Sequence, residues 1–328
     1  MKQQIIATVK RSDDFYDMHE KIAELIKNNV FIFRFNLSKV IDAQKFKELR
    51  NDIIYMRNKY ENIKIMLDIP YPGQKARIVD FCDEQVNIND IIVISSDEKQ
   101  KKDNCIVVDR LYRCYKKGDI LFFADGVGAF EILKEMENNC YEVQAKNTFK
   151  LKKRKSISGY NIEMSEIDLK SVIDLEPDMI AFSFVENTDN IDEILRNIGN
   201  KKIEVIAKIE SQKGVENIEE IVKCYDGIMI ARGDLGLNIP MHKLLDTERI
   251  LSNTAKKNSK KCFIATDIGM SLVNSYMPSR ADIVDMLTIR ELDVDYIIIN
   301  VMVAINRNVS NSLKVIRYLA ADGVYDEK

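Results

Sequence analysis

The sequence predicts an α/β protein, a (β/α)8 TIM barrel with a β-rich lid domain inserted after the third strand. Short, continuously apolar runs recur along the chain, and segments with helical periodicity lie between them. Continuous apolarity is typical of strands buried on both faces of a parallel sheet, and eight strand–helix units close most simply into a barrel. One stretch of about 90 residues breaks the alternation, and without it about 240 residues remain, close to the ~250 of an ordinary barrel.

Eight apolar runs are predicted as the barrel strands, and several are nearly all apolar, such as DYIIIN and DGIMIA. Runs of this length that are bounded by polar residues favour strands over helices. In chain order the predicted strands are Gln4–Val9, Val30–Asn36, Lys64–Ile69, Asp178–Phe184, Glu204–Glu210, Gly227–Ala231, Lys261–Thr266 and Tyr296–Asn300.

The helices of the barrel are predicted from apolar stripes with a period of 3.6 residues. They include Phe15–Lys27, Val215–Val222, Lys243–Ala255 and Ala304–Leu319. Residues 70–159 instead contain short β-like runs, including DNCIVVD and GDILFFADG, and we interpret them as the inserted domain. Residues 1–69 and 160–328 are then the two parts of the barrel.

Composition narrows the possible classes of function. The 328 residues are 46% hydrophobic and 31% charged, which is enough apolar material for a large core. The 49 basic and 52 acidic residues give a net charge of -3, which argues against nucleic acid as a partner. No apolar run approaches the ~18 residues of a membrane span. Six scattered cysteines without a CxxC pair indicate reduced thiols and a cytoplasmic protein.

Polar residues gather at the carboxyl ends of the predicted strands, where such barrels carry their chemistry. Arbitrary polar caps would not bring two arginines, a lysine and several oxygen ligands to one barrel mouth. The residues at these ends are Arg34, Asn36, Ser38, Asp68, Ser183, Lys208, Glu210, Arg232, Gly233, Asp234 and Thr266.

Lys208 and Glu210 are two positions apart, so their side chains point to the same face of the strand. A buried lysine beside a carboxylate is either a structural ion pair or part of a catalytic site. Glu210 and Asp234 together offer two carboxylates, which suits Mg²⁺ or Mn²⁺ because such ions take one or two carboxylates plus substrate and water oxygens. The alternative is that each carboxylate caps the start of a helix.

Several segments carry a family resemblance. IEVIAKIESQKGVENIEEIVKCYDGIMIARGDLGLNIP is similar to the core signature of pyruvate kinase. FRFNLS resembles the Arg-x-Asn-x-Ser strand end of that family, and YKKGDILFFADG resembles part of its inserted domain. The resemblance extends from Ile5 to about Ala321 and implies phosphoenolpyruvate or pyruvate bound between the barrel and the lid.

The resemblance also implies roles for individual residues. Lys208 would neutralise charge on the transferring phosphoryl group and on the enolate, and Arg34 would meet the phosphoryl group. Thr266 would lie near the face of the enolate that is protonated. The divalent metal would be held by Glu210 and Asp234. The substrate carboxylate would be held by the segment Arg232, Gly233 and Asp234 together with Thr266.

The chain departs from the family pattern at the residues that would bind the monovalent cation and the nucleotide. Asn36, Ser38 and Asp68 would be a residual monovalent-cation site, but Ile69 and Gly73 replace a threonine and a charged residue of the family. We therefore do not expect a strict potassium requirement. After the last strand, Asn300–Val303 replaces the family's Ser-Gly-Glu-Thr. Because the sequence stops at Lys328, we expect the family's C-terminal regulatory domain to be absent.

Three functions stay open from the sequence. The first is a glycolytic, Mg²⁺-dependent phosphotransferase that acts on phosphoenolpyruvate or pyruvate with ADP or ATP. The second is a lyase, hydrolase or other transferase that keeps the enolate chemistry but not the nucleotide. The third is a non-catalytic binding homologue. The expected partners are small molecules, without nucleic acid or membrane, and the barrel could associate into a homo-oligomer.

Overall fold

The computed structural model describes residues 3–9, 15–37, 43–69, 76–97, 104–108, 115–136, 140–153, 155–158 and 169–321. The chain divides into two compact units. The first combines Met1–Tyr71 with Glu166–Lys328, and the second is Pro72–Ser165.

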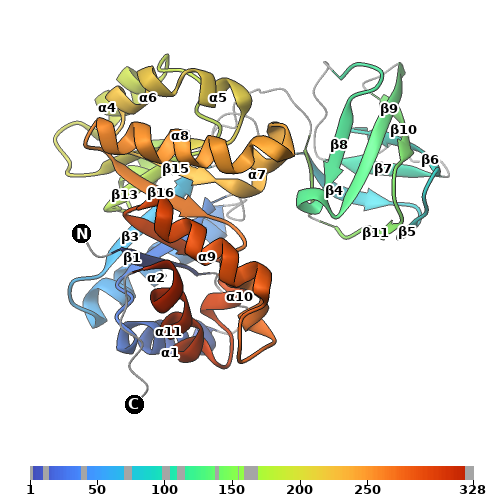
Figure 1. The fold of residues 1–328 in the computed structure, drawn as a ribbon. Coiled ribbons are helices and arrows are strands. Elements are labelled where there is room, and N and C mark those ends of the chain that lie inside the picture. The colour runs from blue at the N-terminus through green and yellow to red at the C-terminus, as the bar shows by residue number, and fades with distance from the viewer. Residues whose placement is uncertain are drawn as a thin grey trace. The chain divides into compact units, whose positions relative to one another are not determined.

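The first unit is a closed barrel of eight parallel strands, as the sequence predicts (Figure 1). Its neighbours around the barrel follow the order β1-β17-β16-β15-β14-β13-β3-β2. The strands are β1 (Gln4–Val9), β2 (Ile32–Asn36), β3 (Lys64–Ile69), β13 (Met179–Phe182), β14 (Glu204–Ile209), β15 (Gly227–Ala231), β16 (Lys261–Ala265) and β17 (Tyr296–Ile299).

Helices follow the strands and surround the sheet (Figure 1). A large apolar core lies between the two layers, with Phe33, Leu67 and Ile264 among its fully buried members. The helices are α1 (Phe15–Lys27), α2 (Ala43–Lys59), α3 (Leu169–Ile173), α4 (Ile191–Ile198), α5 (Gln212–Glu216), α6 (Ile218–Cys224), α7 (Arg232–Asn238), α8 (Leu244–Lys257), α9 (Arg280–Leu292), α10 (Val301–Ala304) and α11 (Val309–Ala320). Two short 3₁₀ segments, η4 (Met241–Lys243) and η5 (Met270–Val273), lie between them.

Alternate residues of each strand form a second apolar cluster, which fills the inside of the barrel. Met66 of β3, Met179 of β13 and Ile206 of β14 belong to it. The side chains two positions further along these strands continue on the inner face. That rule places Asp68 and Lys208 at the carboxyl end of the barrel interior.

The strand and helix ends differ from the predicted ones where side chains or turns redirect the backbone. β2 begins at Ile32 and not at Val30, because the Val30 amide donates to the Leu25 carbonyl and completes the end of α1. The predicted helix Val215–Val222 is two helices that meet at Asn217, whose side-chain amide donates to the Glu186 carbonyl at 2.7 Å.

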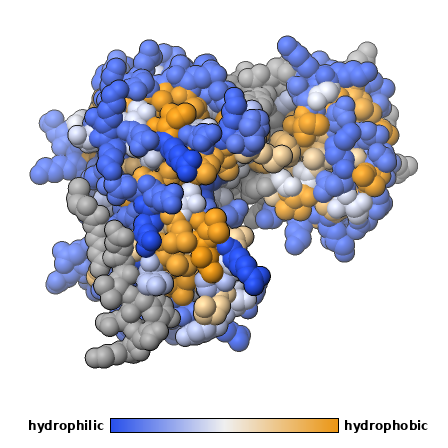
Figure 2. Space-filling view, in the orientation of Figure 1, coloured by the Kyte–Doolittle hydropathy of each residue, from blue (hydrophilic) through white to orange (hydrophobic). Residues whose placement is uncertain are grey.

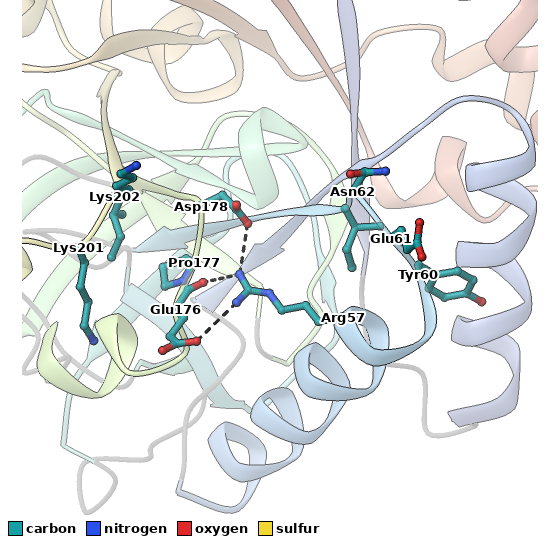
Figure 3. Close-up of a pocket in the computed structure, with 11 residues that line it drawn as sticks. Arg57, Tyr60, Glu61, Asn62, Glu176, Pro177, Asp178, Lys201 and Lys202 are labelled. Carbon is teal, nitrogen blue, oxygen red and sulfur yellow. Dashed lines mark hydrogen bonds and ion pairs between the residues drawn. The ribbon is translucent and has the colours of Figure 1, made fainter.

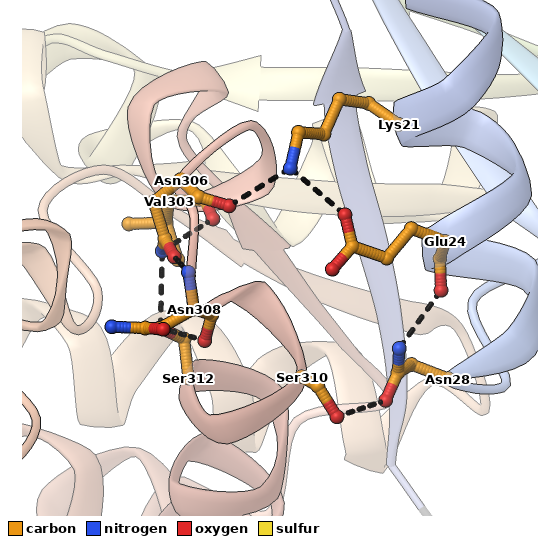
Figure 4. Close-up of polar contacts among 8 residues, drawn as sticks. All are labelled: Lys21, Glu24, Asn28, Val303, Asn306, Asn308, Ser310 and Ser312. Atoms are coloured by element: carbon orange, nitrogen blue, oxygen red, sulfur yellow. Dashed lines mark hydrogen bonds and ion pairs between the residues drawn. The ribbon is translucent and has the colours of Figure 1, made fainter.

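The predicted helix Ala304–Leu319 is also two helices, α10 and α11, and a polar turn joins them (Figure 4). The Asn306 side-chain amide donates to the Val303 carbonyl at 2.9 Å and to Ser312 Oγ at 3.0 Å. Lys21 of α1 donates to the Asn306 carbonyl at 3.2 Å. The turn therefore ties the first helix of the barrel to the last.

The second unit contains a closed, mostly antiparallel barrel with its own apolar core. Phe149 lies in this core against Phe123 and Phe130, at ring-centroid distances of 5.2 and 5.3 Å. Its seven strands are, in order around the barrel, β10 (Cys140–Ala145), β6 (Ile91–Ser95), β7 (Cys105–Val108), β4 (Ala76–Phe81), β12 (Ser156–Ser158), β8 (Ile120–Phe123) and β9 (Gly128–Met136). A two-stranded sheet, β5 (Gln85–Val86) with β11 (Phe149–Lys150), and the 3₁₀ segment η3 (Ala124–Gly126) complete it.

The surface of each unit is largely hydrophilic on the face shown in Figure 2, with apolar residues grouped between the charged ones. Among the exposed large apolar residues are Met241, Met277 and Val284. In the part of the chain that the structure describes, no helix has both the length and the apolarity needed to cross a membrane.

Candidate active site

A buried lysine lies at the carboxyl end of the barrel interior. Lys208, near the end of β14, is only 6% exposed. Its ammonium nitrogen is 3.1 Å from Asp68 Oδ1 and 3.2 Å from Glu210 Oε1, and it donates to Ser183 Oγ at 2.7 Å. Burial alone would lower the pKa of Lys208, but the charges of Asp68 and Glu210 outweigh it and raise the pKa. Lys208 therefore stays protonated.

Arg34 binds the same carboxylate from the other side. Its Nε and Nη2 donate to Asp68 Oδ2 at 2.9 and 2.6 Å, and its Nη1 donates to Thr8 Oγ1 at 2.9 Å. Burial alone would raise the pKa of Asp68, yet Lys208 and Arg34 together lower it. The result is a buried carboxylate held charged between two cations.

Glu210 follows β14 and is 3% exposed. Its Oε2 accepts a hydrogen bond from the Phe184 amide at 2.7 Å. Phe184 has a positive φ of 51°, and the turn there directs its amide toward the carboxylate. Burial raises the pKa of Glu210, Lys208 opposes that shift, and the charge of Asp234 adds to it.

Two carboxylates whose charges repel each other, one of them buried, are suited to share a divalent cation. Glu210 and Asp234 fit such an ion in their chemistry, because both are hard oxygen ligands. Among the described residues, no group of three or more histidine, cysteine, aspartate or glutamate side chains could hold a metal ion. Mg²⁺ commonly takes one or two protein carboxylates and completes its coordination with substrate and water oxygens.

Gly233 and Thr266 lie against each other at the ends of β15 and β16. A Cβ atom on Gly233 would be 3.0 Å from Thr266 Cγ2, a tight contact that would require Thr266 to shift. Gly233 immediately precedes Asp234 at the start of α7. The Thr266 side chain is therefore close to the segment that carries one of the candidate metal ligands.

Arg232 has partners that the sequence did not reveal. Both of its terminal nitrogens bind the Asp285 carboxylate of α9, with Nη2 2.9 Å from Oδ2, and Nη2 also donates to the Thr266 carbonyl at 2.7 Å. Its predicted role as a substrate ligand stays a prediction, but its guanidinium is occupied by protein groups.

The structure thus brings together most of the site residues that the sequence singled out. Asn36 pairs in register with Asp68 on the neighbouring strand, whereas Ser38 lies outside the described residues. The sequence places Ser183 at a strand end without indicating a role for it, although it has the same inward parity as Lys208. Thr8 and Asp285 gave no signal, because their roles depend on partners distant in sequence.

A groove of about 700 Å³ lies at the opposite end of the barrel, beside the residues that precede β3, β13 and β14 (Figure 3). Arg57 in this groove donates to the Glu176 carbonyl and binds Asp178 at 3.2 Å. Lys201 contacts Asp174 at 3.4 Å. Ion pairs line this end of the barrel, which in such barrels serves stability, so the candidate chemistry is at the carboxyl end.

The fold and the site define a class: (β/α)8-barrel proteins with an inserted β-barrel and a lysine–carboxylate cluster at the carboxyl ends of the strands. The family model "Pyruvate kinase, barrel domain" matches residues 1–294. The chain belongs to the pyruvate kinase family.

Named relatives agree with this assignment. The pyruvate kinase of Thermotoga maritima is 26% identical over 97% of this chain and 70% of its own length. That of Debaryomyces hansenii is 28% identical over 87% of this chain and 59% of its own length. The pyruvate kinase of Thermoplasma acidophilum is 27% identical over 87% of this chain and 52% of its own length. The chain thus spans about half to seven tenths of the length of these relatives.

Proposed function

We propose that this protein transfers a phosphoryl group between phosphoenolpyruvate and a nucleoside diphosphate, through the enolate of pyruvate and with a divalent metal. The observation that carries the proposal is the ammonium of Lys208, buried between Asp68 and Glu210 at the carboxyl end of the barrel. Membership of the pyruvate kinase family supports the same chemistry.

Lys208 places a fixed positive charge where the enolate oxygen and the phosphoryl group would carry negative charge. Because the ammonium is already oriented by Asp68, Glu210 and Ser183, little reorganisation is needed during the reaction. Mg²⁺ or Mn²⁺ held by Glu210 and Asp234 would supply further charge neutralisation when bound.

Arg34 is suited to bind the phosphoryl group. Its bonds to Asp68 and Thr8 engage Nε and one hydrogen on each terminal nitrogen. A guanidinium has five N–H groups, so two remain for phosphoryl oxygens among the contacts of the described residues. The Arg34 side chain is 14% exposed, which leaves it accessible from the barrel mouth.

The nucleotide is the less supported half of this proposal, and an enolate enzyme without nucleotide is the second candidate. After β17, the Asn300 side chain accepts from the Met302 amide at 3.0 Å and starts the apolar helix α10. A phosphate-binding loop would instead favour glycine and hydroxyl side chains.

A direct test supplies phosphoenolpyruvate and Mg²⁺ and follows pyruvate with and without ADP. Pyruvate formed only with ADP supports the phosphotransferase, and product without ADP supports the second candidate. Lys208→Met should lower either rate by about 10²-fold or more. The control Lys223→Met changes an exposed lysine of α6 and should leave the rate unchanged. No turnover by the unmodified protein, or full activity of Lys208→Met, would contradict the proposal.

The metal is tested with oxalate, which imitates the planar enolate. Calorimetry should show oxalate binding that is much tighter with Mg²⁺ or Mn²⁺ than with EDTA. Glu210→Gln should weaken both the metal and oxalate, whereas Glu220→Gln, an exposed control on α6, should not. Oxalate binding that is indifferent to metal would exclude the assigned ligands.

A further inference from the structure

The backbone after β16 is held in an unusual conformation at the proposed reaction centre. Thr266 has a φ of 87° and Asp267 a φ of 57°. A β-branched residue rarely adopts positive φ, because the conformation is strained unless its surroundings hold it there. Groups that fix Thr266 therefore decide where its hydroxyl points.

Two consecutive residues at the start of α7 hold Thr266 from different sides. Arg232 Nη2 donates to the Thr266 carbonyl at 2.7 Å, which fixes the peptide after the threonine. Gly233 packs against the side chain, with Thr266 Cγ2 only 3.0 Å from where a Cβ would lie. The position of the hydroxyl thus depends on that of Arg232.

Arg232 is fixed in turn from outside the barrel. The Asp285 carboxylate of α9 accepts from both terminal nitrogens of Arg232, a bidentate geometry that sets the plane of the guanidinium. The Arg232 side chain is 11% exposed. The negative charges of Glu248 on α8 and of Asp267 also act on it. A guanidinium that is bound by one carboxylate and influenced by the charges of two more is poorly suited to bind an anionic substrate.

We propose that Arg232 and Asp285 are a positioning pair, which holds the Thr266 hydroxyl beside the methylene carbon of the enolate without touching substrate. This inference rests on the proposed function. In the step concerned, the enolate carbon gains a proton from water to form pyruvate, the water becomes hydroxide and solvent neutralises it. The Thr266 hydroxyl orients that water, so loss of the pair should slow proton transfer more than binding.

The test compares Asp285→Asn with Asp285→Glu and with Asp246→Asn, an exposed control on α8. Exchange of the methyl protons of pyruvate with deuterated solvent, in the presence of Mg²⁺, reports proton transfer. Asp285→Asn should slow exchange ~10- to 100-fold, because a small misplacement near the reacting atoms has effects of that size. Mn²⁺-dependent oxalate affinity should change far less, and Asp285→Glu should recover most of the exchange.

A second readout is independent of activity. The methyl resonance of Thr266, assigned with Thr266→Ser, should shift in Asp285→Asn and stay in place in Asp246→Asn. Unchanged exchange in Asp285→Asn would overturn the proposal, as would equal losses of exchange and oxalate binding. If the unmodified protein exchanges no protons, the proposed function fails and the catalytic role of the pair fails with it. A shifted resonance would then show that the contact is structural only.

Discussion

Asp68 accepts hydrogen bonds on both of its carboxylate oxygens. Oδ1 is bound by Lys208 and Oδ2 by Arg34. Buried ion pairs gain little net stability, because desolvation of the charges offsets much of their attraction. The proposed function gives this network a role other than stability, which is the charge that it would present to a substrate.

The first prediction concerns monovalent cations. Because two protein cations already bind Asp68, its carboxylate has little need of a further positive charge. We expect no clear change in turnover when a large inert cation is replaced by potassium at constant ionic strength. A several-fold increase under these conditions would show that a monovalent cation still takes part.

The second prediction concerns Glu248, a buried carboxylate on α8. Burial raises its pKa above the ordinary 4.5, Arg232 opposes this shift and Asp285 adds to it. The folded state therefore binds the proton more tightly than the unfolded state, and stability falls as pH rises from the unfolded pKa through the folded pKa. Glu248→Gln removes the ionisable group and with it this loss of stability at higher pH.

Thermal unfolding measures the effect. The gain in melting temperature from Glu248→Gln should be larger at pH 8 than at pH 5, and the exposed control Glu220→Gln should show no such trend. A gain that shrinks as pH rises would mean that attraction to Arg232 outweighs burial at this carboxylate.

Strand β15 begins with Gly227, and its two neighbours in the barrel, β14 and β16, begin with the charged residues Glu204 and Lys261. A Cβ on Gly227 would be 2.8 Å from the Lys261 carbonyl oxygen and 3.0 Å from the Phe263 ring. Lys261 Nζ is 2.5 Å from Glu204 Oε1, so the two strands flanking β15 are joined by an ion pair. The close approach of these strands requires glycine at this position.

The third prediction follows from that contact. Gly227→Ala should lower the free energy of unfolding by ~1–3 kcal/mol, because an added methyl group must displace backbone. Gly236 lies within helix α7, and in Gly236→Ala the new Cβ is 3.7 Å from Leu244 of α8, which is an ordinary contact. Stability should therefore be unchanged or ~0.5–1 kcal/mol higher. Urea unfolding measures the free energy of unfolding of both variants, and equal values for the two would refute the argument.

Local patterns predicted the elements well where a single property decides the structure. Continuous apolarity identified all eight barrel strands, and strand parity placed Lys208 beside Glu210. The same patterns could not show that α5 ends at an asparagine bound to the Glu186 carbonyl. Nor could they show that the Asp285 carboxylate binds the Arg232 guanidinium, because these two residues are far apart in sequence. What the sequence missed depends on distant hydrogen bonds rather than on local propensity.

At the scale of the whole molecule, the second unit has a closed sheet and a separate apolar core. A closed barrel leaves no free strand edge, so this unit does not need the first one to complete its sheet. We expect a fragment of residues 72–165 to fold alone and to unfold cooperatively on heating. Its melting, followed by near-ultraviolet circular dichroism, should coincide with one transition of the full chain. A fragment without a cooperative transition would show that the unit depends on the first.

The parallel pairing of β1 with β17 closes the larger barrel, with Gln4 opposite Tyr296 and Ala7 opposite Ile299. During synthesis β1 therefore cannot pair with β17 until nearly the whole barrel has been translated. Until then the apolar edges of β1 and of the newest strand are open to other chains. Chaperones should thus bind the nascent chain mainly before residue 299 leaves the ribosome. A pause in translation during that interval would favour aggregation.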